Sequence, residues 1–143
     1  MLLKIFIPFL FTLLHGCSKN DLAVKPAAVL LTQQSWILSS HGIDHNQNDR
    51  IEPSEENIQD CEKDNLYHFF MNGSGLWEEN SLQCGTGISE MPFNWKLINH
   101  DTEIDFTVSV AKILILAESE LAIYHEIGQV NGKPLKQITF FRR

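Results

Sequence analysis

The sequence predicts an all-β protein. Eight short apolar or alternating runs follow one another at close spacing, and turn-forming residues separate many of them. No long segment has the 3.6-residue period of an amphipathic helix. Such spacing is typical of a β-sandwich or an up-and-down barrel, and turns between nearest neighbours favour a meander over a Greek key.

The N-terminal half supplies three of the predicted strands. A polar tether over residues 17–26 precedes a short helix over 27–34, and the first strand is expected over 36–40. Residues 41–60 are polar and predict a loop. Strands are then predicted over 66–71 and 76–79, separated by the turn-forming run Asn-Gly-Ser-Gly at 72–75.

The C-terminal half supplies the other five strands, over 93–99, 103–110, 112–117, 121–127 and 135–142. The strand over 103–110 alternates most clearly, since Ile104, Phe106, Val108 and Val110 would share one side. Alternation of this kind is typical of a half-buried antiparallel strand. Apolar side chains that could fill the interior or line a ligand cavity are Phe93, Trp95, Leu97, Ile104, Phe106, Val108, Ile123 and Phe140.

The N-terminus has the pattern of a secretory signal. Lys4 precedes an apolar run over residues 5–14, which is too short to span a bilayer, and Leu-His-Gly-Cys follows at 14–17. Ending on Cys17 resembles the lipobox of bacterial lipoproteins. The resemblance implies a signal peptide over 1–16, lipid on Cys17 and a cell-envelope location. Ser18 in place of an Asp favours the outer membrane.

The rest of the chain, residues 27–143, has the size of one domain. The whole chain carries a formal net charge of −7, and loss of Lys4 with the signal would make it −8. An acidic domain is unsuited to nucleic acid or to anionic headgroups. Membrane attachment would therefore depend on the lipid.

Cys61 and Cys84 remain after Cys17 is assigned to lipid. In an exported chain, two remaining cysteines predict one disulfide. The bond would close a loop of about 24 residues, worth roughly 3 kcal/mol in unfolding free energy. A metal pair or a reactive thiol is the alternative, but Cys-x-x-Cys spacing and a basic cluster are both missing.

Several residues together resemble the lipocalin-like lipoproteins of Gram-negative bacteria. They are Trp36, the run from Cys61 to Gly73, Cys84 and Trp95. The resemblance implies an eight-stranded antiparallel up-and-down barrel of the lipocalin-like type and a Cys61–Cys84 bridge. It also implies closure of the barrel base by an Arg on Trp36. Arg142 or Arg143 could supply that contact; solvated terminal arginines are the alternative.

Residues 44–55 resemble the calcium loop of EF-hands. Asp44, Asn46, Asn48 and Glu55 occupy ligand positions 1, 3, 5 and 12, and Arg50 would contribute its backbone carbonyl. Asp49 replaces the glycine at position 6. The alternative is a solvated loop rich in Asn and Asp for turn formation. The spacing of His41 and His45 suits zinc only on a helix, which is not predicted here.

No hydrolase elbow, phosphate loop or metalloprotease motif occurs, so we do not expect an enzyme. An eight-stranded barrel can be filled by side chains or can hold one small ligand. We therefore expect a non-catalytic protein that binds a small apolar ligand. A structural or protein-interaction lipoprotein with a filled core and a calcium-braced loop is the alternative.

Overall fold

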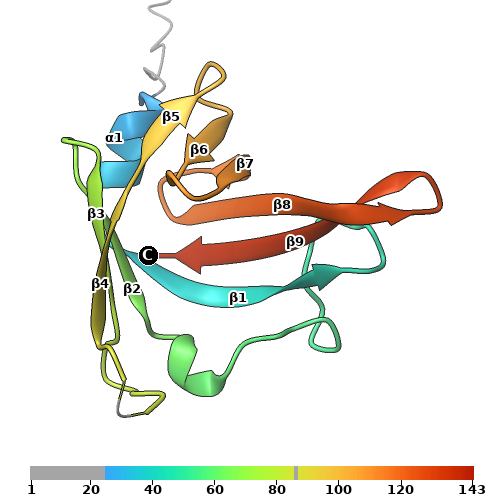
Figure 1. Ribbon diagram of the computed structural model, residues 1–143, viewed down its shortest axis with the longest axis horizontal. Helices are drawn as coiled ribbons and strands as arrows, with labels where there is room; N and C mark the ends of the chain where they lie inside the picture. Colours follow the sequence, from blue (N-terminus) through green and yellow to red (C-terminus); the bar gives the residue numbers. More distant parts are fainter. Residues whose placement is uncertain (1–24, 86) are drawn as a thin grey trace, which may run out of the picture.

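Nine strands form one antiparallel sheet in the computed structural model, which describes residues 25–85 and 87–143 (Figure 1). The order across the sheet is β4-β3-β2-β1-β9-β8-β7-β6-β5. The elements are α1 (Ala27–Thr32), β1 (Trp36–Asp44), the 3-10 turn η1 (Asp60–Glu62), β2 (Leu66–Phe69), β3 (Ser74–Glu78), β4 (Glu90–Asn94), β5 (Lys96–Ile98), β6 (Glu103–Asp105), β7 (Val110–Leu116), β8 (Glu120–Val130) and β9 (Lys133–Arg142). The predicted all-β antiparallel fold with a short N-terminal helix is confirmed.

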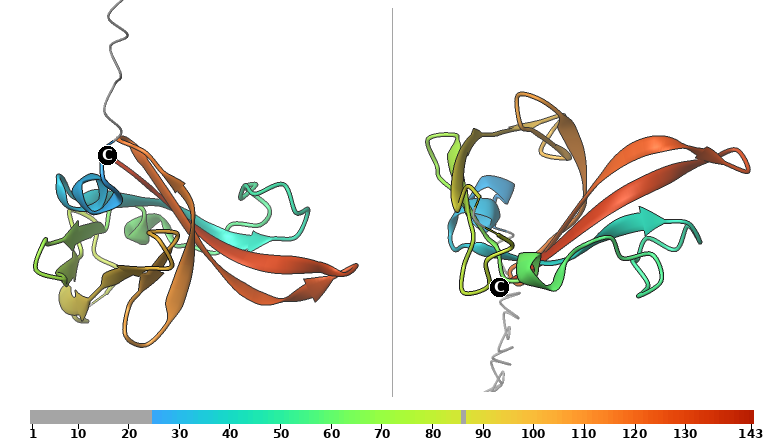
Figure 2. Two further views of the ribbon diagram at one scale, coloured as in Figure 1. Left: turned by 90° about the horizontal axis from the view of Figure 1, so that it is seen from above. Right: turned by 60° about the horizontal axis from the view of Figure 1, so that its bottom comes forward.

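The sheet has nine strands, not eight, because the strand predicted over 93–99 divides at Trp95. Its first part, β4, pairs with β3, and its second part, β5, pairs with β6. These two strands stand at opposite ends of the sheet order, although one residue separates them in sequence. The Trp95 backbone N–H donates to the Gly73 carbonyl at 2.8 Å, and its indole Nε1–H donates to the Ser74 carbonyl at 2.9 Å. The sheet as a whole is strongly curled (Figure 2).

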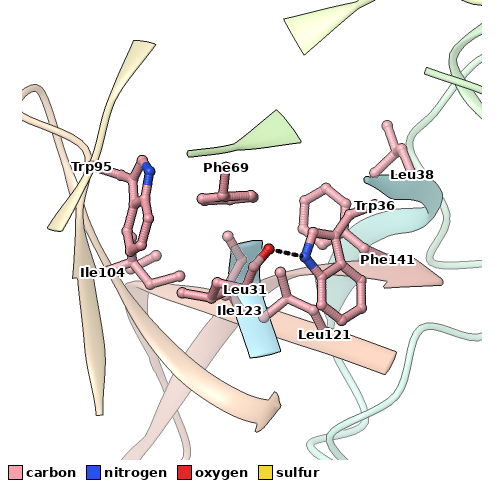
Figure 3. Close-up of a cluster of buried hydrophobic side chains, with 10 residues drawn as sticks. Leu31, Trp36, Leu38, Phe69, Trp95, Ile104, Leu121, Ile123 and Phe141 are labelled. Carbon is pink, nitrogen blue, oxygen red and sulfur yellow. Dashed lines mark hydrogen bonds between the residues drawn. The ribbon is translucent and has the colours of Figure 1, made fainter. Parts of the chain in front are cut away.

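Helix α1 contacts β2 and β7 and contributes to the main core. Pro26 precedes its first turn with a φ of −56°, which suits a helix start, and Leu31 is fully buried. The Trp36 indole Nε1–H donates to the Leu31 carbonyl at 3.0 Å (Figure 3). The core cluster comprises Leu31, Trp36, Leu38, Phe69, Trp95, Ile104, Ala111, Leu121, Ile123 and Phe141.

Strand β1 extends to Asp44, so the loop predicted to begin at residue 41 begins later. Gly42 permits a close approach of the following loop: a Cβ at this position would lie 2.1 Å from the Glu55 carbonyl oxygen. Gly42 forms an isolated antiparallel bridge with Glu56, and the Asn57 N–H donates to the His41 carbonyl at 2.8 Å. Residues 55–58 therefore lie against the edge of β1 beyond the short pairing with β2.

The alternation predicted over 103–110 is wrong after Phe106. Strand β6 ends at Asp105, whose carboxylate accepts the Thr107 N–H at 2.7 Å, and Thr107 has a φ of +74°. The Phe106 N–H then donates to the Ser109 carbonyl, which closes a tight turn. Val108 at the tip is 93% exposed and Val110 is also exposed. The local carboxylate–backbone hydrogen bond competes with strand continuation here.

The hairpin of β8 and β9 projects from the rest of the sheet (Figures 1 and 2). Asn131 and Gly132 form its turn, with φ values of +55° and +77°. Two consecutive left-handed residues match the right-handed twist of the flanking strands, which explains why Asn-Gly is favoured here. The hairpin continues the pairing of β8 and β9 to Val130 and Lys133.

Candidate functional site

An apolar cavity of about 330 Å³ adjoins the core, because Phe69, Ile123 and Phe141 belong to both the cavity walls and the core cluster. The walls come from alternate residues on neighbouring strands, since Tyr67 pairs with Trp77 and Trp77 with Met91. The residues that line this apolar chamber are Tyr67, Phe69, Trp77, Met91, Phe93, Phe106, Ile123, Thr139 and Phe141. An enclosure with mainly aromatic and aliphatic walls and few polar groups is the usual form of a small-molecule site.

Aromatic rings in edge-to-face contact shape this apolar chamber. The Phe69 ring centroid lies 5.3 Å from that of Phe93, 5.4 Å from that of Trp95 and 6.3 Å from that of Phe106. Gly75, opposite Phe93 in the sheet, leaves room for the Phe93 ring, because a Cβ there would lie 2.3 Å from it. Such contacts fix ring orientations, so the walls are preorganised.

A second, polar chamber of about 250 Å³ adjoins the apolar one. Tyr67 and Thr139 line both chambers, and the other lining residues of the polar chamber are Leu38, His41, Asn57, Ile58 and Glu62. Segment 55–58 and η1 close this side of the sheet, where β2 no longer pairs with β1. The interior therefore has an apolar part and a polar part side by side.

His41 is held as a neutral imidazole in the polar chamber. Its Nδ1 lies 2.8 Å from Thr139 Oγ1, and its Nε2 lies 3.1 Å from the Gln137 amide nitrogen. An amide N–H can only donate, so Nε2 accepts and Nδ1 carries the proton. Burial lowers the pKa of His41; Glu62 opposes this shift and His125 adds to it.

Glu62 brings a carboxylate to the same chamber. Burial raises the pKa of Tyr67 to about 12, and the negative charge of Glu62 adds to that shift. The Glu62 Oε2 accepts the Gln59 N–H at 2.7 Å, which fixes the side chain on η1. The electrostatic potential in the polar chamber is therefore negative on the η1 side.

The structure distributes the predicted cavity residues over different surroundings. Phe93, Phe106 and Ile123 line the apolar chamber. Trp95 is buried in the core and Leu97 packs against it. Phe140 lines a separate concavity with Ser40, Arg50 and Arg142. The expectation that Val108 faces the interior is wrong, because it lies at an exposed turn.

Sequence reasoning missed six residues of the apolar chamber: Tyr67, Phe69, Trp77, Met91, Thr139 and Phe141. Tyr67 and Phe69 could have been found, since they are two residues apart in a predicted strand. In β9, two phenylalanines are consecutive, and alternation alone does not tell which one faces inward. Pairing decides it: Phe141 lies opposite Leu121 and Leu38, which are buried.

Of Arg142 and Arg143, the two candidates for the predicted contact with Trp36, Arg143 makes it. The Arg143 guanidinium lies 4.0 Å from the centroid of the Trp36 ring and donates to the Leu30 and Glu118 carbonyls. Arg142 is exposed. One position decides the outcome, because alternate residues of a strand point to opposite faces.

The predicted disulfide between Cys61 and Cys84 is confirmed, with a Cα–Cα distance of 5.2 Å. It joins the segment that contains η1 to the loop between β3 and β4. Asp64 strengthens the same junction, since its Oδ2 accepts the N–H groups of Ser81 and Leu82 at 2.9 and 3.1 Å. The bond therefore holds one wall of the polar chamber.

The backbone of the predicted calcium loop is left-handed at position 6. Asp49 at position 6 has a φ of +61°, the left-handed conformation usually supplied by glycine. Buried Asp44 accepts the Asn48 N–H at 3.0 Å and the Asp49 N–H at 2.9 Å. Glu55 at position 12 accepts the N–H groups of residues 45, 46 and 52 at 2.9, 3.1 and 3.1 Å.

The other predicted ligands of the loop also make internal hydrogen bonds. Asn46 Oδ1 accepts the Asn48 N–H at 3.1 Å, and Asn48 Oδ1 accepts the Arg50 N–H at 2.9 Å. The Lys136 ammonium pairs with Asp49, which places a positive charge beside the loop. Over residues 25–85 and 87–143, no three His, Cys, Asp or Glu side chains gather into a metal-binding group.

A hydrogen-bonded line of Ser35, His68 and Glu78 also escaped sequence reasoning. Ser35 Oγ lies 2.7 Å from His68 Nδ1, and His68 Nε2 lies 3.1 Å from Glu78 Oε1. A serine, a histidine and a carboxylate in this order can activate a nucleophile. None of the three lines the apolar or the polar chamber. We interpret the line as a tie between the α1–β1 connection and strands β2 and β3.

Comparisons with protein-family models, with curated proteins and with solved structures found no match. Within the described part of the chain, no helix has the length and apolar character needed to cross a membrane. Cys17 and the predicted signal lie outside the described residues. The function has to be argued from the two chambers and the sequence.

Proposed function

We propose that this protein is a lipid-anchored protein of the bacterial cell envelope that binds a small apolar ligand without chemical conversion. The observation that carries the proposal is the 330 Å³ chamber with its aromatic walls. Burial of apolar ligand surface contributes roughly 25 cal/mol per Å², and the preset rings reduce the ordering that binding requires.

We further propose that the curled sheet works as a lipocalin-like closed barrel. The chain itself connects the two ends of the sheet order, because β4 passes into β5 through Trp95. Counting β4 and β5 as halves of one bent strand gives a ring in which β1 also pairs with β9. Arg143 on Trp36, with α1 beside them, supports closure of one end. The other end would then admit the ligand.

The anchor is proposed from sequence alone, on the lipobox-like run that ends at Cys17. Cys17→Ser should abolish lipidation, so the protein should move from the membrane fraction to the soluble fraction. Unchanged membrane fractionation of this variant would contradict the anchor. Intact-mass measurement of the wild type should show the diacylglyceryl and acyl groups.

Ligand binding can be tested with variants at the wall of the apolar chamber. Met91 lines the chamber but is 54% exposed, so Met91→Trp should fill part of the space with little effect on folding. It should weaken binding of the uncharged probe N-phenyl-1-naphthylamine at least about tenfold, a change of about 1.4 kcal/mol. Ile88→Trp is the control, because Ile88 is 72% exposed and lines neither chamber.

The proposal fails if the wild-type protein does not enhance probe fluorescence, or if both tryptophan variants weaken binding equally. Native mass spectrometry of protein purified from its own cells provides an independent measurement. A small molecule that co-purifies with the wild type and is lost from Met91→Trp supports the carrier function. If the wild type and Met91→Trp both show only the mass of the ligand-free protein, the result counts against the carrier function.

A calcium-braced loop is the second candidate, in a structural or protein-interaction lipoprotein. The left-handed Asp49 and the buried carboxylate of Asp44 favour it. Lys136 opposes it, because its positive charge lies beside the same loop. Millimolar calcium should raise the melting temperature of the wild type more than that of Glu55→Gln, which lacks the charged ligand at position 12. Equal melting temperatures with calcium and with a chelator would exclude a calcium role.

A further inference from the structure

We propose that the ligand of the paired chambers is an arylalkyl or branched alkyl amine, with its apolar body in the apolar chamber and its ammonium group in the polar chamber beside Glu62. This inference rests on the proposed ligand-binding function and specifies the class of ligand. The class of ligand follows from the charge that the chamber walls carry.

Among residues 25–85 and 87–143, Glu62 is the one full charge on the side chains that line the two chambers. The described residues that form the walls of the apolar chamber include no ionisable group other than Tyr67. In the polar chamber, His41 is neutral because Nε2 accepts a hydrogen bond from Gln137. His125, which lies across from Gln137 on β8, is the further titratable group that influences His41.

The lysine next to Glu62 in sequence pairs with other carboxylates and does not cancel its charge. Lys63 follows it directly, but the Lys63 ammonium pairs with Glu56 at 2.8 Å and with Asp60 at 3.3 Å. Lys63 is also not among the residues that line the polar chamber. The carboxylate of Glu62 affects both His41 and Tyr67, whose pKa values it raises. The electric field of the Glu62 carboxylate therefore reaches the space between His41 and Tyr67.

A ligand head group in this space meets the negative charge of Glu62. An ammonium would gain an attractive pair with Glu62, whereas a carboxylate would bring a second negative charge into a partly enclosed site. Glu62 is only partly buried, so a bound ammonium would keep some hydration and avoid the full cost of charge burial. The chamber thus disfavours fatty acids and selects amines.

The position of Glu62 is fixed by covalent and hydrogen-bonding structure. It is the last residue of η1, next to Cys61, whose disulfide to Cys84 ties the segment to the β3–β4 loop. The capping hydrogen bond from the Gln59 N–H occupies Oε2. A preorganised carboxylate at the junction of an apolar and a polar chamber suits a ligand with one apolar and one cationic end.

Three probes of nearly equal size separate the possible head groups: phenethylamine, 2-phenylethanol and phenylacetate. Isothermal titration calorimetry at pH 7.5 and low salt should rank the amine tightest, the alcohol intermediate and the acid weakest. The amine should bind at least about tenfold more tightly than the acid, the factor expected for charge pairs in a partly hydrated site. Higher salt should narrow this difference.

Glu62→Gln should reduce the ratio of phenethylamine affinity to phenylacetate affinity by at least about tenfold. The affinity for 2-phenylethanol should stay within about twofold of the wild-type value. The glutamine side-chain oxygen can still accept the Gln59 N–H, so the fold is preserved. Asp60→Asn is the matched control: it removes the same charge two residues away, where the side chain is 96% exposed. The Asp60→Asn variant should keep the ratio of amine to acid affinity within about twofold of the wild-type ratio.

The results distinguish this inference from the proposed function. Binding of all three probes with similar affinity, tighter binding of phenylacetate, or an equal response to Asp60→Asn would overturn the amine preference alone. Failure of all three probes to bind at millimolar concentration would overturn the ligand-binding function as well. Circular dichroism and the melting temperature of each variant confirm that the fold is intact.

Discussion

Removal of the Cys61–Cys84 bond should cost much of the stability of this domain. The two cysteines are 23 residues apart in sequence. In the chain-entropy model, closure of a loop of that length lowers the entropy of the unfolded chain and so stabilises the folded state by about 3 kcal/mol at 25 °C. A domain of this size has about 5–15 kcal/mol of total stability. The double variant Cys61→Ser/Cys84→Ser should therefore remain folded at 25 °C but with a small reserve.

Urea unfolding of the domain without its signal, followed by tryptophan fluorescence and by far-UV circular dichroism, measures the effect. With a urea slope of about 1.5 kcal/mol per molar, the midpoint should fall by roughly 2 M. Wild-type protein reduced with a phosphine is the control, since it loses the same bond without a change of sequence. Coincident transitions by both methods support the two-state treatment.

A loss below about 1 kcal/mol would refute the reasoning. It would show that residues 61–84 are already restrained in the unfolded chain, or that the bonded native state is strained by a similar amount. The double variant should also lose part of the preference for phenethylamine over 2-phenylethanol. The reason is that Glu62 follows Cys61 on the segment that the disulfide secures. A loss of stability with no change in selectivity would show that η1 holds its position through Asp64 and Gln59 alone.

Three further predictions concern the framework around the chambers. Arg143→Ala should destabilise the protein by about 1–3 kcal/mol through loss of the Trp36 contact and two hydrogen bonds, whereas exposed Arg142→Ala should stay within about 0.5 kcal/mol in the same urea assay. Gly75→Ala should cost about 1–3 kcal/mol because its Cβ would meet the Phe93 ring, while Gly85→Ala, with nothing within 4 Å, should be nearly neutral. Burial lowers the pKa of His41 below its ordinary 6.5, so the unfolded chain binds more protons and stability should fall as the pH falls below about 6.5. Melting temperatures between pH 7.5 and 5 should show this slope, and His41→Gln should reduce it; an unchanged slope would exclude His41 as its source.

Periodicity predicted the strands well and their partners poorly. The alternation of Phe93, Trp95 and Leu97 correctly indicated which side chains face inward, because each of them is at least partly buried, but it did not indicate the break at Trp95. Nothing in the run indicates that the pairing changes from β3 to β6 at Trp95. Pairing depends on sheet curvature, a property of the assembled sheet and not of one strand.

Local hydrogen bonds explain further differences between the structure predicted from the sequence and the observed structure. Asp105 accepts the Thr107 N–H and ends β6 early, so Val108 lies at an exposed turn despite its apolar side chain. In the Asp44 loop, Asp49 stands at the position where the calcium-loop pattern has glycine, and its backbone is left-handed. The spacing cannot tell whether those oxygens serve backbone N–H groups or a cation, since the same geometry suits both.

The sequence did not decide whether side chains fill the interior or leave a cavity. In the structure, one part of the interior is a packed core and another part is the apolar chamber. Leu31, Trp36, Ile104 and Leu121 are fully buried, and the Leu31–Trp36 hydrogen bond fixes this part around α1. The apolar chamber is lined by residues of β2, β3, β4, β8 and β9 and by Phe106, and Met91 at its wall is 54% exposed. The packed core around α1 supplies most of the stability. The apolar chamber can therefore remain unfilled with little effect on the free energy of folding. Substitutions such as Met91→Trp should therefore change binding with little change in stability, whereas changes at Trp36 should do the reverse.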